Sequence, residues 1–164
     1  MIQAGNGTRE DWETALGRMV CGIYILTVAH GEEINGMAAS WVSPVSYAPP
    51  LLMAAIHPDR RTHGLVEAAG AFALHCLPRE RREWVGRFKG PDPAAKFDGL
   101  AWSTGKTGSP MLEGCPAIFE CRVRHRWAPG NHTLFVGEVV AARTGGDGSV
   151  LSSLDYRGVY LGKD

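Results

Sequence analysis

The sequence predicts a mainly β protein, built as an antiparallel β-barrel with a few short flanking helices. Six or so segments are apolar and rich in β-branched or aromatic residues, whereas helical periodicity is confined to short stretches. Strands and helices do not alternate in the rhythm of a doubly wound sheet, which favours the closed antiparallel arrangement. The chain has 164 residues, the usual size of one domain, so we expect a single domain over residues 1–164.

The chain begins with a predicted helix and a predicted hairpin. Thr8-Arg9-Glu10-Asp11 fits a capping box, and apolar residues then recur at helical spacing, which predicts a helix from about Asp11 to Met19. We expect its apolar stripe to close one end of the barrel. The runs Ile23–Val28 and Ile34–Val42 flank the turn Gly31-Glu32-Glu33 and indicate two strands of a β-hairpin.

The middle of the chain mixes strands with short helices. The apolar run Leu51–Ile56 and the run Phe72–Leu77 are typical of strands, and a short helix is predicted between them at Thr62–Ala69. Glu80–Phe88 is predicted to be a surface helix. The stretch Lys89–Pro116 is rich in Gly, Pro, Ser and Thr and is expected to be a long irregular loop, which usually serves function or packs on a partner.

The clearest strand lies in the last third of the chain. Over Phe119–Trp127, apolar side chains alternate with Glu120 and three arginines, which predicts one buried and one solvated face. The turn Ala128–Asn131 then leads into a second long strand, His132–Arg143, which ends at Gly145–Gly148. A tight turn between two long strands requires them to be antiparallel.

Composition excludes several partners and compartments. Lys plus Arg equals Asp plus Glu at 17 each, so no net field draws in nucleic acid or a membrane surface. With no basic, apolar leader and no apolar run of about 18 residues, we expect a soluble, cytoplasmic protein. Four cysteines lack the C-x-x-C spacing of zinc ribbons and rubredoxin-type iron sites, so buried, reduced thiols are expected. They are Cys21, Cys76, Cys115 and Cys121.

Several familiar catalytic motifs are missing. Gly105-Lys106-Thr107 lacks the upstream glycine and the leading strand of a phosphate-binding P-loop, and no G-x-G-x-x-G follows a strand. No serine stands in a G-x-S-x-G elbow, which removes the usual hydrolase pattern. The six histidines are not spaced as metal ligands, so no metal site is predicted.

Two segments remain as candidates for a binding site. In Asn35–Ser43, small residues interrupt a strand suited to large ones; this indicates either tight barrel packing or a place where a planar ring lies against the backbone near Ser40. Arg60–His63 stands between a strand and a predicted helix, where it is either a solvated, capped helix start or a phosphate site of amides, a hydroxyl and guanidinium groups. The residues alone leave both alternatives open.

Taken together and in this order, these segments resemble a known family. Asn35–Trp41, Val45-Ser46 with Pro49-Pro50-Leu51, Arg61–His63 and Gly130–Val140 resemble the flavin reductase-like, FMN-binding split-barrel family, and the likeness runs from about Leu16 to Tyr160. The resemblance implies a split barrel that binds FMN, with FAD less favoured, in a groove between the two chains of a homodimer.

Within that family, the chain looks most similar to reductases that serve rubredoxin and flavodiiron systems. This narrower likeness rests on Lys106–Pro110, the run from His132 to Val139 and Asp155-Tyr156. The implied function is an NAD(P)H-dependent flavin reductase that passes reduced flavin or electrons to a redox partner protein or to a flavin-dependent monooxygenase. The alternatives are a non-enzymatic FMN electron carrier and a split barrel that binds heme or another ligand in place of flavin.

The resemblance also implies site residues. His132 faces the flavin or nicotinamide as the candidate catalytic residue, or else is an ordinary turn histidine at the start of a strand. The family usually has Gly-Asp-His here, whereas this chain has Gly130-Asn131-His132, with an amide in place of a carboxylate. The implied cofactor-binding residues are Met37, Ala39, Ser40, Trp41, Val42, Ala55, His57, Arg61, Thr62, His63, Lys89 and Lys96. Of these, Arg61 and Thr62, with Lys89 or Lys96, are expected to hold the phosphate.

Overall fold

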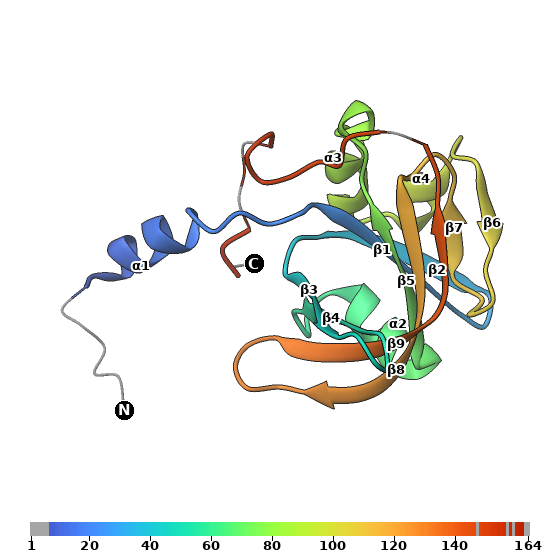
Figure 1. Ribbon diagram of the computed structural model, residues 1–164, viewed down its shortest axis with the longest axis horizontal. Coiled ribbons are helices and arrows are strands. Elements are labelled where there is room, and N and C mark those ends of the chain that lie inside the picture. Colours follow the sequence, from blue (N-terminus) through green and yellow to red (C-terminus); the bar gives the residue numbers. More distant parts are fainter. Residues whose placement is uncertain (1–6, 147, 157, 159, 163–164) are drawn as a thin grey trace.

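The core of the protein is a rolled antiparallel sheet (Figure 1). The computed structural model describes residues 7–146, 148–156, 158 and 160–162. Seven strands pair in the order β2-β1-β5-β8-β9-β4-β3, and every pairing is antiparallel. Their bounds are β1 (Tyr24–His30), β2 (Glu33–Ala39), β3 (Val42–Ser46), β4 (Leu51–Ile56), β5 (Ala71–Cys76), β8 (Ala117–Trp127) and β9 (Thr133–Thr144).

The sheet closes on itself only in part. Strands β2 and β3 follow each other along the chain, separated by Ser40 and Trp41, yet they occupy the two ends of the strand order and do not pair. The sheet must therefore curl to bring its two edges together, and it leaves a split between them. The predicted mainly β, antiparallel split-barrel fold with a few short helices is confirmed.

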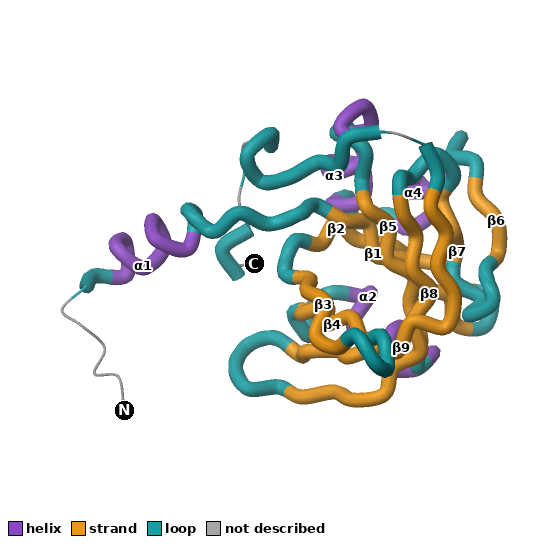
Figure 2. The backbone as a smooth tube through the Cα atoms, in the orientation of Figure 1, coloured by secondary structure: helices purple, strands orange, loops and turns teal. Residues whose placement is uncertain are grey.

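Short helices and a small second sheet complete the structure (Figure 2). No helix among the described residues is both long and apolar enough to cross a bilayer. The helices are α1 (Arg9–Leu16), α2 (Arg61–Ala69), the 3-10 turn η1 (Arg79–Arg81), α3 (Trp84–Lys89) and α4 (Pro93–Phe97). The second sheet pairs β6 (Trp102–Thr104) with β7 (Pro110–Leu112).

Two apolar cores lie on opposite faces of β1. Because side chains alternate along a strand, Leu26 enters one cluster, with Phe72 and Phe135. Ile25 enters the other, which is built with Phe88 of α3 and Leu112 of β7. The helices α3 and α4 and the small sheet thus cover a sheet face that would otherwise be exposed.

The first helix departs from the prediction. It begins at Arg9 and ends at Leu16, and the predicted capping box is present between Thr8 and Asp11. The expectation that its apolar stripe closes the barrel is wrong, because none of its residues is buried and Trp12 is 64 % exposed. The helix lies away from the strands in both Figure 1 and Figure 2.

Two other segments also differ from expectation. The predicted surface helix at 80–88 is split into η1 and α3, and α3 buries Trp84 and Phe88 in the core. The stretch 89–116, predicted as one irregular loop, contains α4, β6 and β7. Its helix and strands are five residues or fewer, too short for periodicity to be read from sequence.

The strict alternation predicted for β8 is interrupted. Its pairing with β9 shifts register between Glu120 and Cys121 and again between Val123 and His125. A bulge adds one residue and moves the following side chains to the other face. The extra residue in β8 is Arg124, and His125 after it is exposed. Glu120, predicted to be solvated, lies before that bulge and is buried for another reason: Thr107 covers it and donates hydrogen bonds to its carboxylate from the backbone and the hydroxyl.

A buried histidine joins β5 to β1 and β7. His75 is fully buried, and its Nδ1 lies 2.9 Å from the carbonyl oxygen of Ile25, which can only accept, so Nδ1 carries the proton. Its Nε2 then accepts from the backbone N–H of Leu112 at 3.1 Å. A second proton on Nε2 would point at the N–H of Leu112 and remove this hydrogen bond. Burial accordingly lowers the pKa of His75 from its ordinary 6.5 to about 4.

We predict that His75 makes the protein sensitive to acid. Between pH 6.5 and 4, His75 is protonated in the unfolded state but neutral in the folded state. The free energy of unfolding therefore decreases as pH falls. The contribution is about 1.4 kcal/mol per pH unit. The free energy of unfolding, measured with urea at several pH values from 7 to 4.5, should fall more steeply with decreasing pH in the wild type than in His75→Gln. The exposed-site control His30→Gln should keep the wild-type slope; equal slopes in all three proteins would contradict the prediction.

Candidate functional site

A cavity of about 780 Å3 opens at the split of the barrel. This is within the size range of small-molecule and cofactor sites. Its wall includes parts of β2, the Ser40-Trp41 link, β4, the start of α2 and the α3–α4 region. Near the C-terminal end of the chain it includes Ser153, Tyr156, Gly158 and Tyr160. Of the residues predicted to bind a cofactor, eleven line it: Met37, Ala39, Ser40, Trp41, Val42, Ala55, His57, Arg61, Thr62, Lys89 and Lys96.

The small residues of the 35–43 segment serve two purposes. At Gly36, a Cβ atom would come within 2.7 Å of Cε1 of Phe88, so the absent side chain makes room for α3. Further along, Ala38, Ala39 and Ser40 line the cavity. Tight packing therefore explains the glycine, and the small residues after it leave the backbone accessible from the cavity.

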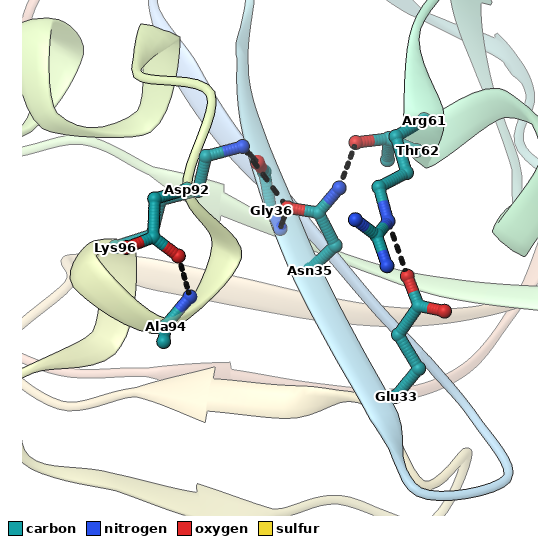
Figure 3. A network of polar contacts seen from close by, with 8 residues as sticks. All are labelled: Glu33, Asn35, Gly36, Arg61, Thr62, Asp92, Ala94 and Lys96. Carbon is teal, nitrogen blue, oxygen red and sulfur yellow. Dashed lines mark hydrogen bonds and ion pairs between the residues drawn. The ribbon is translucent and has the colours of Figure 1, made fainter.

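A polar network crosses one part of the cavity wall (Figure 3). Lys96 of α4 is only 6 % exposed, and its ammonium donates to Oδ1 of Asn35 at 3.0 Å and to the carbonyl oxygen of Gly36 at 2.8 Å. Nδ2 of Asn35 in turn donates to the hydroxyl of Thr62 at 3.3 Å. The network links β2, α4 and α2, three elements that are distant in sequence.

Electrostatics in this part of the wall favours an anion. Burial lowers the pKa of Lys96, and the nearby charges of Arg61 and Arg60 lower it further, whereas Asp92 opposes them. Positive groups are therefore crowded together, and Arg60, Arg61 and Lys96 all line the cavity. An anionic ligand would relieve their mutual repulsion.

Two arginines stand at the start of α2, one in an ion pair and one at the N-cap position. Nε of Arg61 donates to Glu33 at 2.6 Å, and this hydrogen bond raises the pKa of the Arg61 guanidinium. Arg60 occupies the N-cap position without a capping hydrogen bond from its side chain. Of the predicted alternative, a solvated and capped helix start, the side-chain cap is absent, and the positive end of the helix dipole is next to the cavity.

His63 does not line the cavity, contrary to what the resemblance implied. Its Nε2 lies 2.8 Å from the hydroxyl of Thr133, and its ring packs edge-on against Phe135 at 5.0 Å. Burial, Arg126 and His57 lower its pKa. Two residues after Arg61, the helical turn directs His63 toward β9 instead of toward the cavity.

His132 lies one layer behind the cavity wall. It is 5 % exposed, and its ring centroid is 4.8 Å from that of Trp41 and 5.2 Å from that of His57. Its Nε2 is 2.8 Å from the hydroxyl of Tyr160. Trp41, His57 and Tyr160 all line the cavity, whereas His132 does not. His132 therefore reaches the cavity through these three side chains.

Sequence reasoning missed part of the wall. Asn35 belongs to a segment that it singled out but was assigned no role, and Arg60 entered only the phosphate-site alternative and not the set of cofactor-binding residues. Tyr156 and Tyr160 come from a region with no periodic pattern, and Lys89 lies 5.2 Å from the ring centroid of Tyr156. No cluster of three His, Cys, Asp or Glu side chains that could hold a metal occurs in the described part of the chain.

Comparison with known proteins identifies the family. The model of the flavin reductase like domain matches residues 16–162. FMN reductase (NADH) RutF of Stutzerimonas stutzeri is 32 % identical over 154 residues, which cover 92 % of this chain and 88 % of the relative. HsaB of Mycobacterium tuberculosis, the reductase subunit of a flavin-dependent monooxygenase, is 28 % identical over 151 residues, or 92 % of this chain and 80 % of the relative.

A solved structure agrees with this result. The NADH:FAD oxidoreductase SgcE6 of Streptomyces globisporus C-1027, in complex with NAD and FAD fragments, superposes with a TM-score of 0.81. The two proteins are 28 % identical, and the alignment covers 88 % of this chain and 87 % of that chain. The family model spans nearly the whole chain and the split barrel is shared, so the chain belongs to the flavin reductase-like family.

Proposed function

We propose that this protein is an NAD(P)H-dependent FMN reductase that passes reduced flavin or electrons to a partner. Family membership makes it a flavin oxidoreductase; FMN, the nicotinamide donor and the partner are the proposal. The proposal rests on the wall of the cavity described above, which combines two kinds of residue. One part of the wall has the small residues Ala39 and Ser40, and another part has the cations Lys96, Arg60 and Arg61. Such a combination suits a planar ring attached to a phosphate.

The residues of the cavity fit FMN in distinct roles. Ala39 and Ser40 leave room for a ring to approach the backbone, and Trp41 offers an aromatic surface beside it. Arg60, Arg61, Thr62 and Lys96 would hold the phosphate. FMN, when bound, supplies the redox chemistry, because it accepts hydride from a nicotinamide and passes electrons on. The protein contributes position, exclusion of water and fixed charge.

A redox partner is proposed from the comparison with a relative. HsaB is named as the reductase subunit of a flavin-dependent monooxygenase, and it aligns over most of this chain. We propose that this chain likewise passes reduced flavin or electrons to a monooxygenase or to another redox protein.

We predict that the purified protein binds FMN and that NADH or NADPH reduces it. The test adds FMN to cofactor-free protein, follows quenching of flavin fluorescence, and then adds NADH or NADPH without oxygen. Rapid loss of the visible flavin absorbance supports the reductase. Bound flavin that stays oxidised with both nucleotides would overturn the enzymatic proposal in favour of an electron carrier. Absence of FMN binding would overturn the proposed cofactor, and a parallel titration with FAD tests that alternative.

We predict that Lys96→Met raises the Kd for FMN about tenfold, the size of one lost hydrogen bond to a charged group. Fluorescence titration measures the Kd. Lys106→Met is the matched control, because Lys106 is exposed and does not line the cavity. The control should bind FMN as the wild type does. Equal affinity in wild type and Lys96→Met, with both folded by circular dichroism, would exclude Lys96 from the site.

We also propose a homodimer, supported by the exposed N-terminal arm. Helix α1 has eight residues, too few to be stable alone in water, yet it buries none of them. Trp12, Met19 and Val20 are each at least 60 % exposed, whereas Leu16 and Met19 also border the cavity. A second copy that covers this arm would bury its apolar residues and lie beside the site.

We predict that sedimentation velocity gives twice the mass of one chain and that Trp12→Glu shifts the protein toward monomer. The buried charge would oppose the contact. Glu10→Gln, on the same helix, changes an exposed charge and should remain dimeric. A monomeric wild type would overturn the proposal.

A further inference from the structure

Residues 160–162 are fastened over the indole of Trp41 by three contacts. The hydroxyl of Tyr160 is 2.8 Å from Nε2 of His132, and Nδ2 of Asn131 donates to the carbonyl oxygen of Gly162 at 3.2 Å. Gly162 has a φ of +76°, and a Cβ there would lie 2.6 Å from Cη2 of Trp41, so only glycine permits this approach. We call Asn131, His132, Tyr160 and Gly162 the clamp.

The direction of each hydrogen bond in the clamp follows from its partner. The carbonyl oxygen of Gly162 can only accept, so the amide of Asn131 presents its NH2 group to it and turns Oδ1 toward His132. Nδ1 of His132, 2.8 Å from Oδ1, must then carry the proton. In neutral His132 this leaves Nε2 as an acceptor, and the hydroxyl of Tyr160 donates to it.

The clamp depends on an amide at position 131. A carboxylate, which the resembled family usually has here, accepts from His132 equally well but has no hydrogen to donate to the carbonyl of Gly162. An aspartate would therefore keep the histidine oriented and lose the second attachment of residues 160–162. The asparagine joins both functions in one side chain.

The clamp acts on the cavity through its wall. Trp41 and Tyr160 both line the cavity, and their ring centroids are 5.3 Å apart. His132 stands behind both rings, at 4.8 Å from Trp41 and 5.8 Å from Tyr160. If residues 160–162 detached, Trp41 would lose the backbone packed on its indole, and this side of the cavity would open to solvent.

We propose that Tyr160 and Asn131 are positioning residues that hold this wall closed and so slow the release of the flavin. The proposal rests on the proposed function and deepens it: the chain retains its flavin between turnovers instead of exchanging it freely. Neither residue needs to touch the reacting atoms, because each acts by fixing residues 160–162 and Trp41.

The test measures the dissociation of FMN by stopped-flow fluorescence after dilution of the FMN-loaded protein. Tyr160→Phe removes the hydroxyl and keeps the ring, and Asn131→Asp removes the donor to Gly162 and keeps the acceptor. Each variant should release FMN about three- to tenfold faster, the change expected for one lost hydrogen bond. Tyr47→Phe is the matched control; Tyr47 is 96 % exposed and outside the cavity wall, so its loss of a hydroxyl should leave the release rate unchanged.

A second readout separates positioning of the wall from a general loss of structure. Because Asn131 does not line the cavity, the maximal rate at which NADH reduces bound FMN in Asn131→Asp should stay within about twofold of wild type. Asn131 is exposed, so Asn131→Asp should fold normally even if Tyr160→Phe does not.

Each outcome decides between the proposals. Wild-type release rates in both variants would overturn the clamp while leaving the reductase in place. Faster release in Tyr160→Phe alone would overturn the assignment to Asn131. A drop in the reduction rate of Asn131→Asp equal to its gain in release rate would overturn the positioning role. If the wild type binds no FMN, the proposed function itself fails.

Discussion

The site depends on one topological constraint: β2 and β3 are consecutive but cannot pair. A two-residue link usually makes a hairpin, yet here it carries the chain from one edge of the sheet to the other. Trp41 is fixed in this link because its carbonyl accepts from the backbone of Ala55 at 2.9 Å. The cavity opens at the split between the two edges, so the strand topology determines where the site lies and the side chains determine its chemistry.

The same constraint explains the buried lysine. An edge strand presents backbone groups that no neighbouring strand satisfies, and proteins commonly cover such edges with helices or charges. Here α3 packs on β2 through Phe88, and Lys96 of α4 donates to the edge carbonyl of Gly36. Lys96 thereby satisfies the edge and places a positive charge in the cavity wall. On a chain with no net charge, Arg60, Arg61 and Lys96 thus concentrate positive charge in one part of the cavity wall.

Short-range patterns in the sequence were sufficient to predict most strands of the main sheet, and the family resemblance added eleven residues of the cavity wall. The run Leu51–Ile56 was predicted with its observed bounds, since prolines and a His-Pro-Asp stop enclose it. The bulge before His125 was not predictable, because a register shift arises from pairing with β9 and leaves no local pattern. The burial of Glu120 was not predictable either, because it depends on a tertiary contact with Thr107. The helix α1 showed the expected periodicity, but periodicity does not reveal what surface a helix will contact.

His132 illustrates the limit of reasoning from a motif to a role. The motif Gly130-Asn131-His132 was singled out from the sequence, but one of the side chains that separate His132 from the cavity is Tyr160, 28 residues later and in a region without periodicity. A buried imidazole that accepts from one side chain and donates to another is well suited to fix their geometry. In this chain, the neighbouring amide extends that geometry to the backbone of Gly162. The influence of His132 on the cavity therefore runs through the aromatic wall, because Trp41, His57 and Tyr160 separate its ring from whatever the cavity binds.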